Sequence, residues 1–434
     1  MKLEANKFRN LIFAISLAAV AFNSIAARYL GRYGDKAANL DFWAYYFAAQ
    51  TVRDNPHAVL YLGATAPNPQ VYPAPADSDI GLHAARAGFP RVMQFVYPPM
   101  LADALAPLSR LSPETAATIW RVFNLLCLGA SILMIARLIG IRWLSFEFAA
   151  LFLAAFSFYP IHEALDLGQI SVPMLGLWTL SILAYKEGHV VFSACVMALA
   201  TGLKVTPVLV LPLFILWKDR RWLIAYFTAG FGLLAALAAT HGVAMLHAFV
   251  QALTRMSGVE PAELNKNIGS ILAWIYYGRL FDQDSMVQVI SAPAPMLSIA
   301  SKVVSAAFLL GCLYPIWKSR ARMGRAGKAN AIAVIAMATL AISPVSWRHG
   351  YAIAFLPLAM AWAGVLRQRA PLWQSLVLGL TTISIGAMLF ERAAALPLPV
   401  LAQIFFASLW VLSSVAFCLT ALWQSTRASD TTSS

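Results

Sequence analysis

Charged side chains are scarce in this sequence. They make up 12% of its 434 residues, about half the share typical of a soluble domain, whereas 60% of the residues are hydrophobic. Apolar windows long enough to cross a hydrocarbon layer of about 30 Å recur from residue 8 to residue 423. The composition therefore excludes a soluble protein and predicts a polytopic membrane protein with no separate soluble domain.

The spacing patterns of metal, disulfide and nucleotide sites are also missing. The four cysteines lie in apolar windows and form no CxxC pair, so neither a disulfide framework nor a metal site is indicated. The histidines form no HExxH motif, and neither a Walker loop nor a dinucleotide-binding fingerprint is present. We therefore expect no metal and no cofactor.

Acidic residues are outnumbered, 19 against 32 lysines and arginines, which gives a formal net charge of +13. The basic residues are dispersed between apolar spans and line no single polar surface. We therefore expect membrane lipids as partners and no nucleic acid.

What is present is a series of apolar segments, which predicts an all-α fold of about 12 spans. We place the spans near residues 8–30, 118–139, 144–160, 169–186, 190–203, 206–217, 222–243, 297–317, 329–343, 350–366, 371–391 and 398–423. The first could be a cleaved signal peptide, but an uncleaved span is preferred because its apolar run is long and many spans follow. The two short spans that meet at "GLKVTP" are expected to dip into the membrane and return.

Dense Lys and Arg in short loops mark the cytoplasmic face. The loops "KDRRW" at 218, "KSRARMGRAGK" at 318 and "RQR" at 367 share a face with the basic N-terminus, which places both termini in the cytoplasm. We expect one catalytic membrane domain, 1–423, followed by a disordered cytoplasmic tail, 424–434.

A long outer loop, 31–117, lies on the opposite face. Its segments 41–54 and 95–108 are expected to be helices in the plane of the membrane interface. The stretch between them, "APNPQVYPAPADSDIG", is rich in turn residues and is expected to be irregular.

Asp41 opens the first of these helices, in "LDFWAYYFAA". An Asp in this position could cap the helix by accepting hydrogen bonds from free amide groups. Alternatively, a carboxylate among aromatic rings at the membrane surface loses water, gains proton affinity and can act as a general base. Both interpretations stay open from the residues alone.

Other polar residues of the outer segments have a structural and a functional interpretation each. In "YPP", Tyr97 precedes two prolines that make a rigid turn or shape a site. Gln169, in "GQIS", could cap a span or donate to a substrate hydroxyl. Asn267, in "NKNIGS", could cap a short helix or contact a polar ligand.

Three basic side chains could bind an anion on the outer face. Lys204, between the two short spans, could extend to the interface or point inward and pair with a phosphate. Arg348 and His349, in "SPVSWRHGY", meet at a helix start, where anions are favoured.

Together these segments resemble glycosyltransferase family 87, whose members have a GT-C type fold and use polyprenyl-phosphate sugars. The resemblance covers most of the chain and rests on the motifs "LDFWAYYFAA", "FVYPPMLADALAPLSRL", "WRVFN", "LGQIS", "GLKVTP" and "SPVSWRH". It implies that Asp41 is the catalytic base and that His349 lies near the donor phosphate. Since Phe42 follows Asp41, a metal-binding acid pair is disfavoured, and since Gly350 follows His349, acceptor contacts there are in doubt.

The resemblance implies an inverting transfer of a hexose, mannose in this family, to a lipid or glycan acceptor at the periplasmic face of a bacterial inner membrane. Arg348, His349 and Lys204 would stabilise the departing phosphate, and Tyr45, Tyr97, Gln169 and Asn267 would contact the substrate. The alternatives are a lipid-linked-sugar transporter or flippase, which predicts ionisable residues midway through spans and internal symmetry, and a non-catalytic scaffold subunit.

Overall fold

The computed structural model describes residues 40–61, 74–89, 91–143, 145–281, 295–368, 372–387 and 398–427. Within these ranges the regular secondary structure is helical, and β-pairing is confined to two isolated bridges, Ala262 with Phe281 and Asn265 with Trp347. The predicted all-α class is confirmed.

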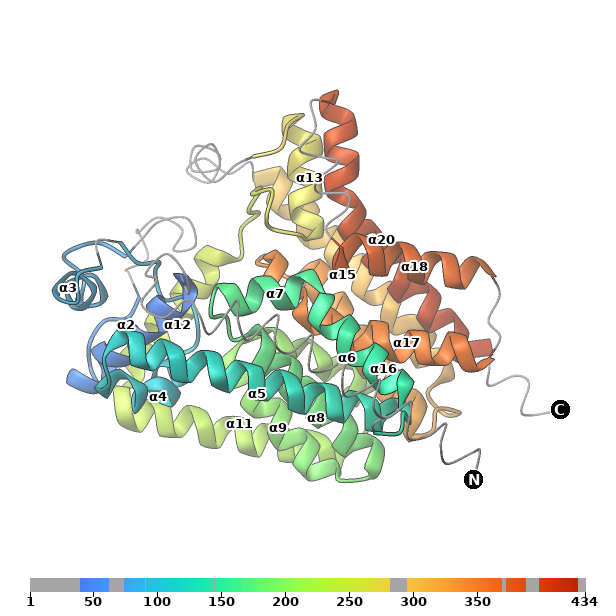
Figure 1. The fold of residues 1–434 in the computed structure, drawn as a ribbon, viewed down its shortest axis with the longest axis horizontal. Coiled ribbons are helices and arrows are strands. Elements are labelled where there is room, and N and C mark those ends of the chain that lie inside the picture. The colour runs from blue at the N-terminus through green and yellow to red at the C-terminus, as the bar shows by residue number, and fades with distance from the viewer. Residues whose placement is uncertain are drawn as a thin grey trace.

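The N-terminal half of the described chain contains α2 (Leu40–Asp54), α3 (Asp79–Arg86), α4 (Pro99–Leu105), η1 (Leu108–Arg110), α5 (Pro113–Ile139), α6 (Phe146–Ser157), α7 (Tyr159–Asp166), α8 (Ser171–Glu187), α9 (Val190–Leu203), η2 (Thr206–Val210) and α10 (Leu211–Leu216). The C-terminal half contains α11 (Arg220–His241), α12 (Val243–Met256), α13 (Ile268–Tyr277), α15 (Pro295–Ser319), α16 (Arg325–Ile342), η3 (Arg348–Ala354), α17 (Phe355–Gln368), α18 (Leu372–Gly386) and α20 (Val400–Arg427). In Figure 1, α5, α8, α9 and α11 lie lengthwise beside one another, and α13, α15, α18 and α20 form a second group.

Every predicted span after the first overlaps one or two of the helices, and 8–30 lies outside the described residues. The count of about 12 is not reproduced. Within the described ranges six helical segments are long and apolar enough to cross a membrane, and a seventh is added if α6 and α7, bent by 55°, form one span. Helices such as α9 and α18 are apolar but shorter. Two short helices, α12 and α13, occupy the segment between the predicted spans 222–243 and 297–317.

The long helices define two ends of the bundle. At the end where α5 and α8 terminate, Lys186 Nζ donates to Leu138 O at 2.6 Å, and Tyr185 Oη donates to the Asp219 carboxylate at 2.9 Å. The Lys328 ammonium lies 5.2 Å from the centroid of the Trp217 ring, so the basic loops at 218 and 318 meet at this end. The predicted clustering of these two loops on one face agrees with this arrangement.

The chain turns back at Lys204 as expected. α9 begins at the end of the bundle where α8 terminates, and η2 and α10 lead the chain back to that end. The return is shown by Trp217, which follows α10 and stacks on Tyr185 in α8 with 6.3 Å between ring centroids. The turn itself, at Lys204 and Val205, therefore lies towards the opposite end of the bundle.

The helix expected over 41–54 is present as α2, but its aromatic rings face the protein core. The rings of Phe42, Trp43, Tyr45, Tyr46 and Phe47 are all buried in the core of the protein. They pack against neighbouring helices, as when Phe42 stacks on Trp120 with 5.8 Å between centroids, so they do not anchor the helix in the interface.

Two boundaries differ from the prediction. α3 overlaps the last three residues of the stretch that was expected to be irregular, and Ser78 caps the helix by accepting a hydrogen bond from Gly81 N. At the other end of the chain α20 continues to Arg427, so the first four residues assigned to the tail are helical. The rest of the tail, 428–434, lies outside the described residues.

Candidate functional site

The N-terminus of α2 docks on the turn between α7 and α8. The carbonyl oxygen of Leu167 accepts hydrogen bonds from Asp41 N at 3.1 Å and from Phe42 N at 3.3 Å, which satisfies two amide groups of the first helical turn. Gly168 adopts a left-handed φ of 65°, and its carbonyl accepts a hydrogen bond from Trp120 Nε1 at 2.7 Å. The "LGQ" turn thereby fixes where α2 begins.

Gln169 joins three of the predicted site residues. Its amide nitrogen donates to Asp41 Oδ2 at 2.6 Å, and its amide oxygen accepts from Tyr45 Oη at 2.8 Å and from Tyr97 Oη at 2.9 Å. Burial raises the pKa of both tyrosine hydroxyls, so they remain protonated donors. The two phenols orient the amide, and the amide nitrogen is thereby directed at the carboxylate.

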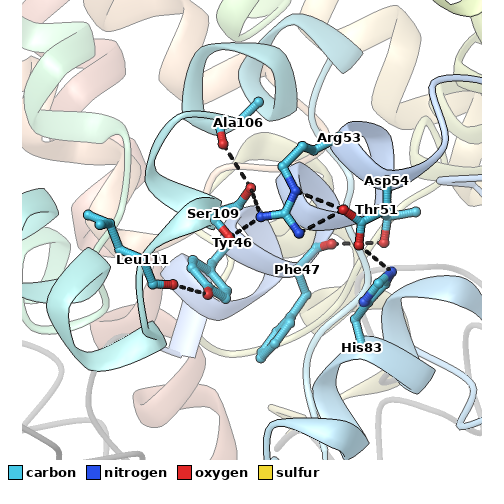
Figure 2. Close-up of polar contacts among 9 residues, drawn as sticks. All are labelled: Tyr46, Phe47, Thr51, Arg53, Asp54, His83, Ala106, Ser109 and Leu111. Atoms are coloured by element: carbon cyan, nitrogen blue, oxygen red, sulfur yellow. Dashed lines mark hydrogen bonds and ion pairs between the residues drawn. The ribbon is translucent and has the colours of Figure 1, made fainter.

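The middle and the C-terminal end of α2 are also held by polar contacts (Figure 2). Tyr46 Oη donates to Leu111 O at 2.7 Å, and the Arg53 guanidinium donates to the carbonyl of Ser109. The same guanidinium pairs with Asp54 at 2.7 Å. α2 is therefore fixed at both ends, and Asp41 has little freedom to move.

Burial shifts the pKa values of Asp41 and of the nearby Lys204. Loss of water raises the pKa of its carboxyl to about 6, and the nearby Glu163 adds to the rise, while the Gln169 hydrogen bond and Lys204 oppose it. Burial also lowers the pKa of Lys204 to about 8, against the attraction of Asp41. Near neutral pH Asp41 is therefore a carboxylate and Lys204 an ammonium, and each favours the charged form of the other.

A cavity of about 470 Å³ lies beside this pair. We call it the Lys204 cavity, because Lys204, Tyr97 and His349 supply polar groups to a wall that is otherwise largely apolar, including Leu309 and Ile353. The Lys204 ammonium lies 5.9 Å from the centroid of the Tyr97 ring. Asp41 is not among the lining residues; it is linked to the cavity through Gln169 and Tyr97.

The other predicted residues are engaged elsewhere. Arg348 Nη2 pairs with Glu163 Oε1 at 2.7 Å, so the charge of this arginine is balanced next to the site. Asn267 caps α13, with its side-chain oxygen accepting from Ser270 N at 2.9 Å, and its amide nitrogen donates to Pro344 O. The capping interpretation of Asn267 is the one that the geometry supports.

Glu163 was not predicted as a site residue. It contributes to the raised pKa of Asp41 and balances Arg348, so it links α7, η3 and the start of α2. Its position in "IHEALDLGQIS", one helical turn before the glycine turn, is the signal that could have identified it.

In chemical terms the site offers a carboxylate of moderately raised basicity, an ammonium, an imidazole and an apolar cavity that meet at one end of a helical bundle. Such a set can take a proton from a hydroxyl and stabilise an anionic leaving group that carries an apolar chain. Among the residues with defined placement, no three His, Cys, Asp or Glu side chains gather so that they could hold a metal.

Comparison with known proteins gives the class. The model of glycosyltransferase family 87 matches residues 95–344, more than half of the chain, so the chain belongs to this family. The resemblance seen in the sequence motifs is confirmed.

One relative is the polyprenol-phosphate-mannose-dependent alpha-(1-2)-phosphatidylinositol pentamannoside mannosyltransferase of Mycobacterium tuberculosis (strain CDC 1551 / Oshkosh). It is 26% identical over 293 residues, which cover 64% of this chain and 60% of the relative. The match thus spans about three fifths of the relative's length.

Proposed function

We propose that this protein transfers a hexose, mannose by analogy with its relative, from a polyprenyl-phosphate donor to a lipid or glycan acceptor. The observation that carries the proposal is the hydrogen bond between Gln169 and Asp41 next to an apolar cavity lined by Lys204, whose charge favours the ionised form of Asp41. The donor named for the relative has both an anionic phosphate and a long apolar chain, and the Lys204 cavity suits such a molecule.

Asp41 is the proposed base. A carboxyl with a pKa of about 6 is ionised at neutral pH and is still basic enough to accept the proton of an acceptor hydroxyl. The hydroxyl attacks the anomeric carbon while the polyprenyl phosphate leaves on the opposite side, so the configuration inverts. Gln169 is the proposed positioning residue, because its amide nitrogen donates a hydrogen bond of 2.6 Å to the Asp41 carboxylate.

Lys204 and His349 are the proposed contacts of the departing phosphate. Both line the cavity, and the Lys204 ammonium is a fixed cation that stabilises the charge growing on the phosphate as the bond breaks. Burial, with Lys204 and Arg348 nearby, holds the pKa of His349 well below its usual value, so its role is that of a neutral imidazole that donates a hydrogen bond to the phosphate. Arg348, proposed for the same role from the sequence, is less suited because Glu163 balances its charge. Tyr97 is the proposed sugar contact at the cavity wall, and Tyr45 supports Gln169.

The site end is proposed to face the periplasm of a bacterial inner membrane. Support comes from the arrangement of the bundle, since the basic loops at 218 and 318 meet at the end away from Asp41. A polyprenyl-phosphate donor can reach that side without a nucleotide sugar having to cross the membrane.

The test is the substitution Asp41→Asn, assayed with polyprenyl-phosphate mannose in detergent or nanodiscs. Asn keeps the shape of the side chain but removes the base, so transfer should fall about 10²–10⁴-fold while the protein inserts normally. Retained turnover in a correctly inserted Asp41→Asn protein would exclude the base role. Asp77→Asn, a change of the same type at an exposed position, is the matched control and should keep full activity.

A further inference from the structure

A second apolar cavity lies next to the Lys204 cavity. It has a volume of about 380 Å³ and is bounded by α9, α11 and α12, so we call it the α11 cavity. Its walls include Gly202, Phe227, Phe231 and Val250. In Figure 1, α9 and α11 lie side by side along one edge of the bundle.

The two cavities share a wall built from two motifs of the sequence. Pro98, Val205, Val208 and Leu253 line both of them. In the motif "YPPM" the first residue, Tyr97, faces the Lys204 cavity, whereas Pro99 and Met100 face the α11 cavity.

The motif "GLKVT" divides in the same way. Gly202 lines the α11 cavity, Lys204 and Thr206 line the Lys204 cavity, and Val205 lines both. The wall between the two cavities therefore ends beside Lys204, which is the only lysine among the described residues that line either cavity.

The chemistry of the α11 cavity fits a hydrocarbon chain. The described residues that line it carry no charge, and the hydroxyls of Tyr226 and Thr201 are hydrogen-bonded to each other at 2.9 Å. Phe227 and Phe231 are also exposed on the outside of the bundle, so the cavity opens between residues that face the surrounding lipid. A free, water-soluble glycan would find no partner in it.

We propose that the α11 cavity holds the hydrocarbon chain of a lipid-anchored acceptor, while the Lys204 cavity holds the donor. This inference rests on the proposed function, because it needs a transfer reaction with two substrates at one point. A transferase that joins two lipid-linked molecules must bring two apolar chains to one catalytic centre along separate paths, and the two cavities that meet at "YPP" and "GLKVT" supply them. The acceptor class is thereby narrowed from lipid or glycan to a lipid-anchored hydroxyl.

The test uses a matched pair of glycines in α11. A Cβ atom added at Gly230 or at Gly232 would meet nothing within 4 Å, so a side chain can begin at both positions without a clash. Gly230 lines the α11 cavity, whereas Gly232 lies on the exposed surface and is not among its lining residues. Gly230→Leu therefore fills the cavity, and Gly232→Leu controls for the same change elsewhere in the helix.

The probe is n-octyl α-mannoside with a photoactivatable diazirine at the end of its chain. We expect it to label peptides of α9, α11 and α12, and to label Gly230→Leu about tenfold less, because loss of about two buried methylene groups weakens binding by that factor. Gly232→Leu should be labelled like the parent protein. Equal labelling of both variants, or labelling of the Lys204 cavity instead, would overturn the proposal.

Two further measurements separate the other possibilities. A farnesyl-phosphate-mannose probe with the same diazirine should label residues of the Lys204 cavity; if it labels α11 instead, the α11 cavity is the donor site and the proposal is wrong. An excess of unlabelled octyl mannoside should suppress labelling by the octyl probe, whereas equal suppression by a phospholipid without a sugar would mean that the cavity holds bulk membrane lipid. Hydrolysis of polyprenyl-phosphate mannose by the parent protein is measured separately and tests the proposed function. If the parent protein hydrolyses no donor, the proposed function fails, whereas the labelling result still shows which cavity binds the octyl chain.

Discussion

At the scale of single residues, the decisive contact is the hydrogen bond from Gln169 to Asp41. Burial and Glu163 push the proton affinity of the carboxyl up, and Gln169 and Lys204 push it down. The balance leaves a base that is ionised at neutral pH but close to its titration range, which is the condition under which general base catalysis is efficient.

This balance predicts a bell-shaped pH dependence of kcat/KM. Activity should rise as Asp41 loses its proton, with half of the maximum near pH 6, and should fall as Lys204 loses its proton, near pH 8. The measurement is transfer from polyprenyl-phosphate mannose between pH 5 and pH 9. In Lys204→Arg the alkaline limb should move to higher pH, because the guanidinium stays charged; an unmoved alkaline limb would assign it to another group.

The positioning role of Gln169 has its own signature. Gln169→Leu removes the donor that stabilises the ionised carboxylate, so the pKa of Asp41 should rise and the acidic limb should move to higher pH. Tyr45→Phe is the control, since it leaves the Tyr97 bond to Gln169 in place and should displace the limb less. A rate loss without a displaced acidic limb would indicate a merely structural role.

At the scale of elements, the site depends on the short helix α2 and on what fixes its ends. The "LGQ" turn holds its start, the contact of Tyr46 holds its middle, and the contacts of Arg53 hold its end (Figure 2). The helix is buried on most of its surface, so it is part of the core and not a loosely attached surface segment.

Arg53→Met should therefore loosen α2. The variant leaves the partly buried carbonyl of Ser109 without its charged donor, which should cost about 1–3 kcal/mol and lower the unfolding temperature. The measurement is thermal unfolding in detergent together with the transfer rate, which should fall as Asp41 loses its fixed position. Arg110→Met, at an exposed position in η1, should leave both quantities unchanged; a similar loss there would refute the specific role of Arg53.

The elements show how far the sequence alone could lead. Span positions were predictable because a long apolar run is a local property, and α5, α11 and α20 lie where expected. The burial of α2 was not predictable, because the same aromatic residues suit a membrane interface or a protein core. Which of the two they occupy depends on distant partners such as Trp120.

Polar residues at the edges of apolar segments pointed to Asp41, Tyr97 and Gln169, which do come together. Their partners were not predictable: Gln169 contacts a carboxylate 128 positions away, and Arg348 contacts Glu163, 185 positions away. Only the packing of α2, α7 and η3 decides such pairs.

At the scale of the whole molecule, the two ends of the bundle differ in chemistry. Basic loops meet at one end, and the Asp41 cluster lies at the other. This separation is the pattern expected of an enzyme that works at one membrane face, whereas a transporter needs ionisable groups along a path through the bilayer.

Cysteine labelling can test the orientation. In a background without native cysteines, Leu82→Cys, near the site end, should react with a membrane-impermeant maleimide in intact spheroplasts. Ala321→Cys, in the basic loop after α15, should react only after the membrane is permeabilised. The reverse pattern would place the catalytic centre in the cytoplasm.

The docking of α2 on Leu167 has a consequence for biosynthesis. The carboxylate is made early, but the carbonyl and the amide that seat it are added more than a hundred residues later. A nascent chain that ends within α5 therefore contains the proposed base without the groups that position it. We expect such a chain to be inactive until α7 and α8 have been synthesised and packed against α2.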